Sequence, residues 1–357
     1  MNEMRQMIID SVTKIMKDVC TKEVINESEK GVWAGELWDT LAEAGMITVG
    51  VPEELGGVGF EYEDAFEILR LAGKFAAPLP LSETYIANWL LARLGKEASD
   101  EPLTIQIPGK GEPMRLAQTD GGWLVTGQVS WVPWARHAKR MIVLGQTDAG
   151  GAVAIVPLEK ARIEHGQNLA GEPRDEVSFA GAFVSDEHVI AVENLDEVTE
   201  FLTYSGAAAR CVMMAGALER VLEMSVTHAK ERTQFGRPLH RFQAIQQQIA
   251  LLAGENVAAN MAADYAVKAY AAGKLKHDIA MAKMRVGEAA GTAAAIAHQI
   301  HAAIGFTFEH TLHQSTRRLW SWRDEFGTES QWGSVLADHF MAPDFGGIWD
   351  FLTRREA

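Results

Sequence analysis

Cysteine is scarce in this sequence. The 357 residues include two, Cys20 and Cys211, which lie far apart and in different expected helical segments. This spacing argues against a disulfide framework and indicates a reducing compartment. The first residues, Met1–Gln6, carry no signal-peptide pattern, so we expect a cytoplasmic protein.

Basic charge and long apolar runs are also lacking. With a formal net charge of −15, the protein would repel the phosphates of a nucleic acid, so we expect no nucleic-acid partner. We find no uninterrupted apolar stretch of bilayer length and therefore expect no membrane partner. The 47% of hydrophobic residues still suffice for a large core, and the length favours two or three structural units over one.

The spacing of apolar residues divides the chain into three parts. Residues 1–102 repeat apolar side chains every three or four positions, as helices do, with Gly45 expected to end one helix and Ser82 to cap another. Residues 103–193 change to short alternating runs separated by Gly, Pro and Asp, the pattern of strands. Helical spacing returns over 194–357. We therefore predict a mainly α fold with an N-terminal helical domain, a middle β domain and a C-terminal helical bundle.

The most specific motif interrupts the helical pattern of the C-terminal part. Residues Glu231–Leu239 read Glu-Arg-Thr-Gln-Phe-Gly-Arg-Pro-Leu, and Phe-Gln-Ala-Ile-Gln follows at 242–246. Gly tolerates unusual dihedrals and Pro cannot donate to a helix ladder, so this stretch should end a helix and leave Arg232 pointing outward. Composition alone would also allow an ordinary helix–loop–helix. The order of residues resembles the flavin-contacting signature of the acyl-CoA dehydrogenase family.

The resemblance covers essentially the whole chain. The glycine-rich loop Ile47–Gly59 lacks the Lys-Ser/Thr pair of a phosphate-binding loop and is similar to a Val-Pro-Glu-Glu-x-Gly-Gly turn of the family. The order helix, strand, helix is that of the family fold, a helical domain, a small β-barrel or sandwich and a four-helix bundle. The resemblance implies FAD as cofactor, an acyl-CoA thioester as substrate and an electron-transfer flavoprotein as electron acceptor.

The resemblance assigns the ADP half of FAD to residues in and after the motif. Arg232 would pair with the pyrophosphate, because a guanidinium fork has the right geometry. Phe235 would pack on the cofactor and Gln243 would hydrogen-bond it.

A second stretch, His298–His310, is similar to the family's Gln-x-x-Gly-Gly-x-Gly-Phe stretch on the adenosine side. Gln299 keeps the glutamine, whereas Ala302 and Ala303 replace the two glycines and add methyl groups where the backbone approaches the ligand. His298 and His301 lack a convincing carboxylate ligand beside them, so we expect helix-packing residues and no metal.

The flavin-ring half resembles the family less. Residues 103–110 stand where catalytic members carry Thr-Glu-Pro-x-Ala-Gly-Ser-Asp. Trp131 keeps the family's Trp, but Pro133 replaces a Thr whose hydroxyl would face the flavin N5, and proline has no such donor. Thr328, at the end of the late Glu-Gly-Thr motif, is the remaining expected cofactor contact.

The catalytic base is also missing from its usual places. The two family positions of the glutamate that removes the α-proton fall on Phe326 and Gly206. Glu325, one residue earlier, is the candidate base if the loop shifts, since a base must reach within about 3 Å of its proton. The alternative is a surface carboxylate paired with one of three arginines, Arg317, Arg318 or Arg323.

These observations favour one hypothesis and leave two others open. The first is a subunit of a heterotetrameric acyl-CoA dehydrogenase that holds the ADP of FAD while a homologous chain supplies the flavin-ring site and the base. It resembles the short subunits of α2β2 enzymes that act on bulky CoA thioesters, in fatty acid or sterol side-chain degradation. The second is a self-sufficient homotetramer that uses Glu325, and the third is a non-catalytic scaffold subunit.

Overall fold

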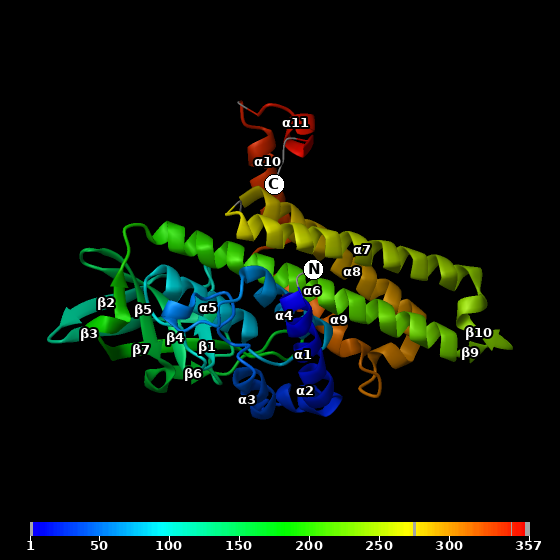
Figure 1. Ribbon diagram of the computed structural model, residues 1–357, viewed down its shortest axis with the longest axis horizontal. Helices are drawn as coiled ribbons and strands as arrows, with labels where there is room; N and C mark the ends of the chain where they lie inside the picture. The colour runs from blue at the N-terminus through cyan, green and yellow to red at the C-terminus, as the bar shows by residue number, and fades with distance from the viewer. Residues whose placement is uncertain (1–2, 274–275, 344, 354–357) are drawn as a thin grey trace. The chain divides into compact units, whose positions relative to one another are not determined.

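The computed structural model describes residues 3–273, 276–343 and 345–353 (Figure 1). The chain forms two compact units, residues 1–206 and 207–357, and each is treated by itself below. Helices open and close the chain and a sheet lies between them in sequence, which confirms the predicted mainly α fold with a central β region. The exact three-domain boundaries at 102 and 193 stay a prediction.

The first unit begins with helices whose apolar residues recur at helical spacing. They are α1 (Glu3–Val19), α2 (Lys22–Ser28), α3 (Gly35–Glu43), α4 (Tyr62–Lys74) and α5 (Leu81–Arg93). In α1 the buried side chains are Ile8, Val12 and Met16, which lie four residues apart on one face. Gly45, with a φ of 73°, follows the end of α3 as predicted.

The predicted cap at Ser82 is wrong. α5 starts at Leu81, with Pro80 at its N-cap position, and Ser82 is buried inside the helix. The hydroxyl of Ser82 donates to the neighbouring Glu83 carboxylate at 2.8 Å. Because α5 is buried on nearly every side, its polar residues find partners inside the protein and do not mark its start.

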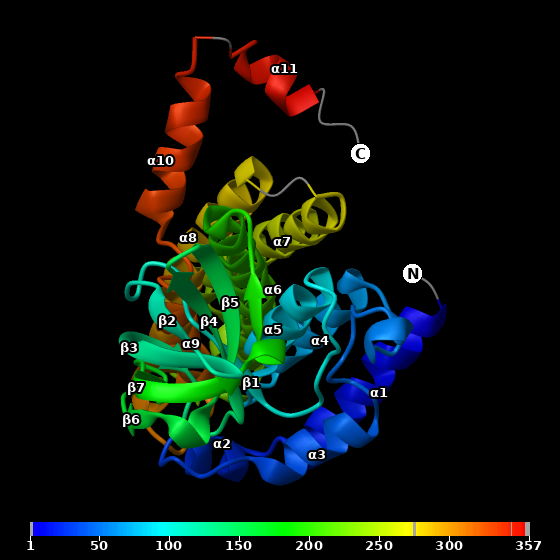
Figure 2. The same cartoon turned by 90° about the vertical axis from the view of Figure 1, so that its left-hand side faces the viewer.

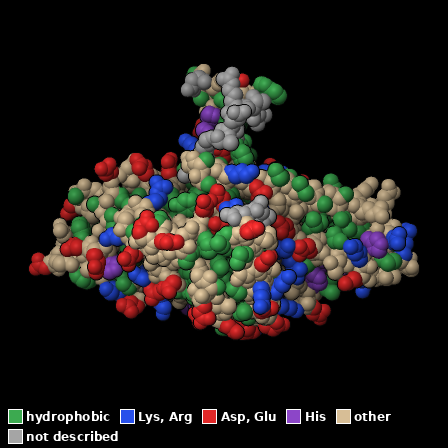
Figure 3. All heavy atoms as spheres, viewed as in Figure 1, with side chains coloured by type: hydrophobic (Ala, Val, Ile, Leu, Met, Phe, Trp, Pro, Cys, Tyr) green, Lys and Arg blue, Asp and Glu red, His purple; other side chains and the backbone are tan. Residues whose placement is uncertain are grey.

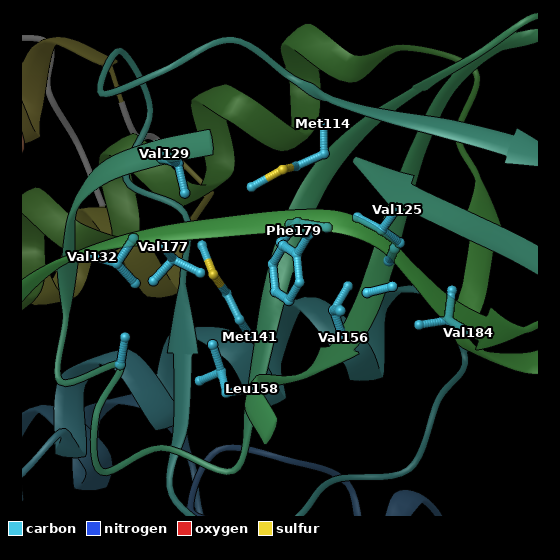
Figure 4. Close-up of a cluster of buried hydrophobic side chains, with 14 of the residues drawn as sticks. Met114, Val125, Val129, Val132, Met141, Val156, Leu158, Val177, Phe179 and Val184 are labelled. Atoms are coloured by element: carbon cyan, nitrogen blue, oxygen red, sulfur yellow. The ribbon is translucent and has the colours of Figure 1, made fainter. Parts of the chain in front are cut away.

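Among the described residues, the sheet of the first unit has the order β6-β7-β3-β2-β4-β5-β8, with β1 added beside β4. Its strands are β1 (Leu103–Ile105), β2 (Met114–Thr119), β3 (Gly122–Pro133), β4 (Arg140–Thr147), β5 (Gly150–Pro157), β6 (Arg162–Glu164), β7 (Arg174–Ser185) and β8 (Val189–Ala191). Neighbours are antiparallel except that β4 pairs in parallel with β1 and β2. Figure 4 shows Met141 of β4 and Val177 and Phe179 of β7 pointing into the same apolar interior.

The end of β3 is irregular at the residues expected to face a flavin ring. The register with β7 shifts between Val129 and Val132. Trp131 and Trp134 have φ values of 66° and 57°, in a left-handed region that side chains with a Cβ enter at a cost of roughly 1–2 kcal/mol. The shift turns Trp131 away from the core, and its side chain is 41% exposed.

The second unit is built from long helices (Figures 1 and 2). α6 (Leu195–Glu231) enters it from the first unit and is followed by α7 (Gln243–Ala271), α8 (Lys276–His301), α9 (Leu312–Trp322), α10 (Glu329–Phe340) and α11 (Ile348–Thr353). α8 packs against α7, α9 and α10. The facing sides of α7 and α8 are rich in buried alanine, whose small side chain lets helix backbones approach closely.

By length and mean hydropathy alone, one helix among the described residues, α6, could cross a membrane. An 18-residue window of this 37-residue helix reaches a mean hydropathy of 1.2, and 94% of that window is buried inside the protein. Such burial is typical of a core helix.

Candidate functional site

The motif Glu231–Leu239 forms a tight hairpin between α6 and α7. Strands β9 (Thr233–Gln234) and β10 (Arg237–Pro238) pair antiparallel around Phe235 and Gly236. Both turn residues have left-handed φ values, 51° and 78°, as a two-residue type I′ turn requires. The sequence predicted the end of α6 here, but it did not predict the hairpin.

The predicted ADP-binding residues of this hairpin point away from the protein. Phe235 is 91% exposed, and Arg232 and Gln243 are exposed as well. Among the residues that the structure describes, the Arg232 side chain makes no hydrogen bond or ion pair. A charged fork and an amide that are free at a rigid turn are suited to a polyanionic ligand.

Two neighbours to which the sequence analysis assigned no role, Phe242 and Arg237, pack at the turn. The ring of Phe242 contacts Phe235 edge-on, with centroids 6.2 Å apart. The Arg237 guanidinium lies over the Phe242 ring at 4.1 Å. Arg237 belongs to the motif and Phe242 begins the stretch 242–246 that follows it, so the sequence carried the signal.

The second predicted stretch lies at the same end of the unit as the hairpin. The rings of His228 and His301 stack with centroids 4.5 Å apart, which places the end of α8 beside the last turns of α6. Gln299, Ala302 and Ala303 are exposed there. Ala302 has a φ of 53°, so alanine occupies a backbone conformation that favours glycine.

The predicted flavin-ring contacts are already engaged within the chain. The Lys110 ammonium lies over the Trp131 ring, 5.9 Å from its centroid. Pro133 is buried, and its carbonyl accepts a hydrogen bond from the hydroxyl of Thr104. The Thr328 hydroxyl accepts from the backbone N–H of Gln331 and caps α10.

Glu325 is buried, so the expectation of a surface carboxylate is wrong. Its carboxylate accepts a hydrogen bond of 2.7 Å from Nε of Arg210 on α6. The two residues are 6% and 1% exposed. If Glu325 took up a proton here, it would lose its charge-assisted hydrogen bond with Arg210. The buried guanidinium of Arg210 would then lose that negative partner.

Hydrogen bonds from Lys283 and Trp332 hold the turn that carries Glu325. Lys283 of α8 donates from its ammonium to the carbonyls of Arg323 and Gly327, at 2.6 and 2.8 Å. Burial lowers the pKa of Lys283 to about 8. The indole of Trp332 donates to the carbonyl of Phe326 at 3.1 Å. These bonds leave little freedom for the one-residue shift that would move Glu325 to the family's base position.

Phe326 occupies the predicted base position itself. It is 6% exposed, has a φ of 55°, and its ring centroid lies 5.5 Å from the Arg210 guanidinium. Sequence reasoning named Glu325 and Phe326 but missed Arg210 and Lys283. Single charges inside alanine-rich apolar helices were the available signal, because such a charge needs a buried partner.

No group of three or more histidine, cysteine or carboxylate side chains within the described part of the chain could hold a metal ion. Cys20 and Cys211 are both free and buried. Burial raises the pKa of Cys211 to about 12, so its thiol is not reactive.

Comparison with known proteins relates the chain to one family. The family models of the acyl-CoA dehydrogenase N-terminal and C-terminal domains match residues 2–102 and 198–331. Acyl-CoA dehydrogenase FadE27 of Mycobacterium tuberculosis is 28% identical over 85% of this chain and 88% of its own. Acyl-CoA dehydrogenase IpdE2 of the same organism is 26% identical over 88% and 91%.

A solved structure is similar over almost the full length. The ChsE4–ChsE5 complex from Mycobacterium tuberculosis contains a chain with a TM-score of 0.83 and 25% identity, over 96% of this chain and 99% of that one. A protein similar to this chain was thus crystallised as part of a complex.

Replacing Glu325 by Gln should lower the free energy of unfolding by about 3–5 kcal/mol, because Arg210 would keep a buried charge without its counterion. The double variant Arg210→Met/Glu325→Leu should recover most of that loss. Urea unfolding measures both. Glu164→Gln, in the exposed pair with Arg162, is the matched control and should cost less than about 1 kcal/mol. Equal effects of Glu325→Gln and Glu164→Gln would contradict a structural ion pair.

Proposed function

The chain belongs to the acyl-CoA dehydrogenase family, and from that premise we propose that it is one subunit of a heteromeric enzyme. The family's reaction is the α,β-dehydrogenation of an acyl-CoA thioester, for which FAD supplies the hydride acceptor. In our proposal this chain holds the ADP part of FAD. A homologous partner chain supplies the flavin-ring site and the catalytic glutamate.

The hairpin between α6 and α7 supports the first half of this proposal. Arg232, Phe235 and Gln243 are exposed on a turn that Phe242 stiffens. A residue that points outward from a rigid turn can reach a ligand seated mainly on another chain. The guanidinium would bind pyrophosphate oxygens in pairs, and the aromatic ring would cover apolar cofactor surface.

The state of the flavin-ring residues supports the second half. A general base must be free to approach the proton that it removes. Glu325 is instead buried against Arg210, and the aromatic ring of Phe326 fills the position beside it. This buried ion pair is the observation that carries the proposal, because it engages Glu325, the candidate base of a self-sufficient chain.

The outer face of α7 supports association with another chain. Four large apolar side chains, Leu251, Val257, Met261 and Tyr265, are 38–64% exposed. From 243 to 263 the sequence has a single charged residue, Glu255, and it pairs with Arg285. Figure 3 shows charges of both signs spread over the face in view. An uncharged apolar helix face on such a protein is typical of a helix–helix interface.

The proposed partner of the α7 face is a homologous acyl-CoA dehydrogenase subunit. The similar ChsE4–ChsE5 protein was solved as a complex. Gly254 lies in the middle of the face with open space where a Cβ would point, so another backbone can come close. By analogy with the family, we propose a bulky acyl-CoA thioester as substrate and an electron-transfer flavoprotein as electron acceptor.

The second candidate is a self-sufficient homotetramer, and the position of Glu325 next to the family's base position favours it. In that case folded Glu325→Gln would lose turnover with acyl-CoA. Activity should be divided by the folded fraction measured by circular dichroism, because the substitution also destabilises the chain. Unchanged turnover per folded molecule would exclude this candidate.

Replacing Arg232 by Ala should weaken FAD binding to the complex at least tenfold and so lower its flavin content, because one charge-assisted contact is worth about 1.5–3 kcal/mol. The chain would be co-purified with its partner from the source cell, and FAD per chain measured by absorbance. Arg220→Ala, on the same helix in an exposed pair with Glu223, is the control and should keep the flavin. The unmodified chain expressed alone should bind little flavin. Unchanged flavin in Arg232→Ala would favour a scaffold subunit, and a flavinated, active homotetramer would overturn the proposal.

Replacing Met261 by Glu should prevent assembly, because it places a charge in the middle of the uncharged α7 face. Light scattering after size-exclusion chromatography would measure the mass of the complex. Leu169→Glu changes an apolar side chain that is 60% exposed outside α7 and should leave the mass unchanged. A complex of full mass in Met261→Glu would show that partners bind elsewhere.

A further inference from the structure

Histidines are concentrated at one end of the second unit. Five of the eleven in the chain gather there from four separate segments: His228 of α6, His298 and His301 of α8, His310 of the following loop and His313 of α9. We call these five residues the histidine cluster. Their rings lie stacked or edge-on against one another or against aromatic neighbours, at centroid distances of 4.1–6.3 Å.

Hydrogen bonds fix which ring nitrogen of His298 carries its proton. Nε2 of His298 lies 2.9 Å from the hydroxyl oxygen of Thr316, and that hydroxyl donates to the carbonyl of Leu312. The hydroxyl proton is therefore in use, so the imidazole must donate from Nε2 and leave Nδ1 unprotonated. Nδ1 is buried and has no hydrogen-bond partner among the residues that the structure describes. A proton added there would be a buried charge without an acceptor.

His310 and His313 also lie in settings that a further ring proton would disturb. Nδ1 of His310 accepts the backbone N–H of Leu312 at 3.0 Å, at the start of α9, and a proton on that nitrogen would break the bond. His313 is 6% exposed, and neither of its ring nitrogens has a hydrogen-bond partner within the described residues. Uptake of a proton by either residue thus opposes the closed arrangement.

The charged groups around the cluster are mostly positive. Arg232 lies just beyond the end of α6, four residues after His228, and Arg317 and Arg318 lie beside His313 on α9. Glu309, next to His310, is the sole carboxylate in the sequence of the loop between α8 and α9. Protons added to the cluster would therefore be repelled by the three arginines and attracted by Glu309.

Burial lowers the pKa of His228, His298 and His301. The neighbouring His301 lowers the pKa of His228 and His298 further, and Arg232 does the same for His228. The carbonyls of Ala297 and Met224 partly oppose this for His301. Burial, followed by Arg317 and Arg318, lowers the pKa of His313 to about 4. An imidazole in an open segment titrates near 6.5, so the open form binds more protons as the pH falls below that value.

The cluster supports the segment Ala302–Thr311. The ring of Phe306 stacks on His298 at 4.1 Å. A Cβ added to Gly305 would lie 3.0 Å from Cβ of His301 and 3.3 Å from Nδ1 of His298, so the backbone rests directly on the cluster. The segment exposes Phe306 and Phe308, and it carries Ala302 and Ala303 of the predicted adenosine site.

We propose that the histidine cluster is a proton-sensitive latch that holds Ala302–Thr311 closed at neutral pH and releases it in mild acid. The latch is a property of this chain by itself. Its consequence rests on the proposed function: release would loosen the grip of the chain on the ADP end of FAD.

Hydrogen–deuterium exchange of the whole chain at pH 7.5 and pH 5.5 tests the latch. After correction for the intrinsic exchange rates, peptides covering 302–311 should lose protection at least tenfold at pH 5.5, the effect of one pKa unit of differential proton binding. Peptides from the middle of α7 and from β3 should keep their protection. Equal protection of 302–311 at both pH values would overturn the proposal, and so would a simultaneous loss in all three regions, which indicates global unfolding.

Variants separate the latch from general acid sensitivity. In His298→Gln/His310→Asn/His313→Leu the amides keep the hydrogen bonds to Thr316 and Leu312 but do not titrate, so segment 302–311 should stay protected at pH 5.5. His339→Gln is the control, because His339 stacks on His277 outside the cluster, and its response should equal that of the unmodified chain. If the triple variant does not fold, His310→Asn alone should reduce the response. If the folded variant lost protection of 302–311 at pH 5.5 as much as the unmodified chain does, the proposal would be wrong.

Flavin content of the co-purified complex at the two pH values gives a separate result. Loss of flavin at pH 5.5 in the unmodified complex, but not in the triple variant, would support both proposals. Loss of protection at 302–311 without any change in flavin would keep the latch and count against the ADP-holding role of this segment.

Discussion

The buried ion pair between Arg210 and Glu325 is the constraint on which the second unit depends. Two charges far apart in sequence can stay inside an apolar bundle only if they meet, so the pair fixes α6 against the turn after α9. Lys283 adds a third buried charge that binds the carbonyls of the same turn. Together they fix a turn whose counterpart in the family carries chemistry.

This constraint explains why the two halves of the expected site differ. The residues expected at the flavin ring or as the base already contact other residues of the chain. Glu325 contacts Arg210, Trp131 contacts Lys110 and Thr328 contacts Gln331. Arg232, Phe235 and Gln243 remain exposed. Side chains with internal partners contribute to stability, whereas exposed side chains on a rigid turn are available to another molecule. The division supports a chain that completes a site located mostly elsewhere.

The sequence predicted what depends on local pattern. Apolar spacing located the helices and strands, and the motif at 231–246 predicted the end of α6 that leaves Arg232 pointing outward. It did not reveal contacts between distant residues, such as Arg210 with Glu325 or His228 with His301, because periodicity gives the face of a helix and not its partner. The cap expected at Ser82 failed for the same reason, since burial on all sides of α5 outweighed a local preference.

The histidines and alanines of the 298–313 stretch belong to one physical arrangement. Where the family has glycines, Ala302 adopts a left-handed φ, which costs roughly 1–2 kcal/mol and must be offset by packing nearby. Within the same segment, Phe306 stacks on His298, His310 meets His301 edge-on and Gly305 rests against both His298 and His301. Neutral imidazole packs in this way because it is flat and can be buried, but the same burial penalises its protonated form. A strained segment supported by titratable rings is therefore stable only while those rings are neutral, and this couples the shape of the segment to pH through the residues that hold it in place.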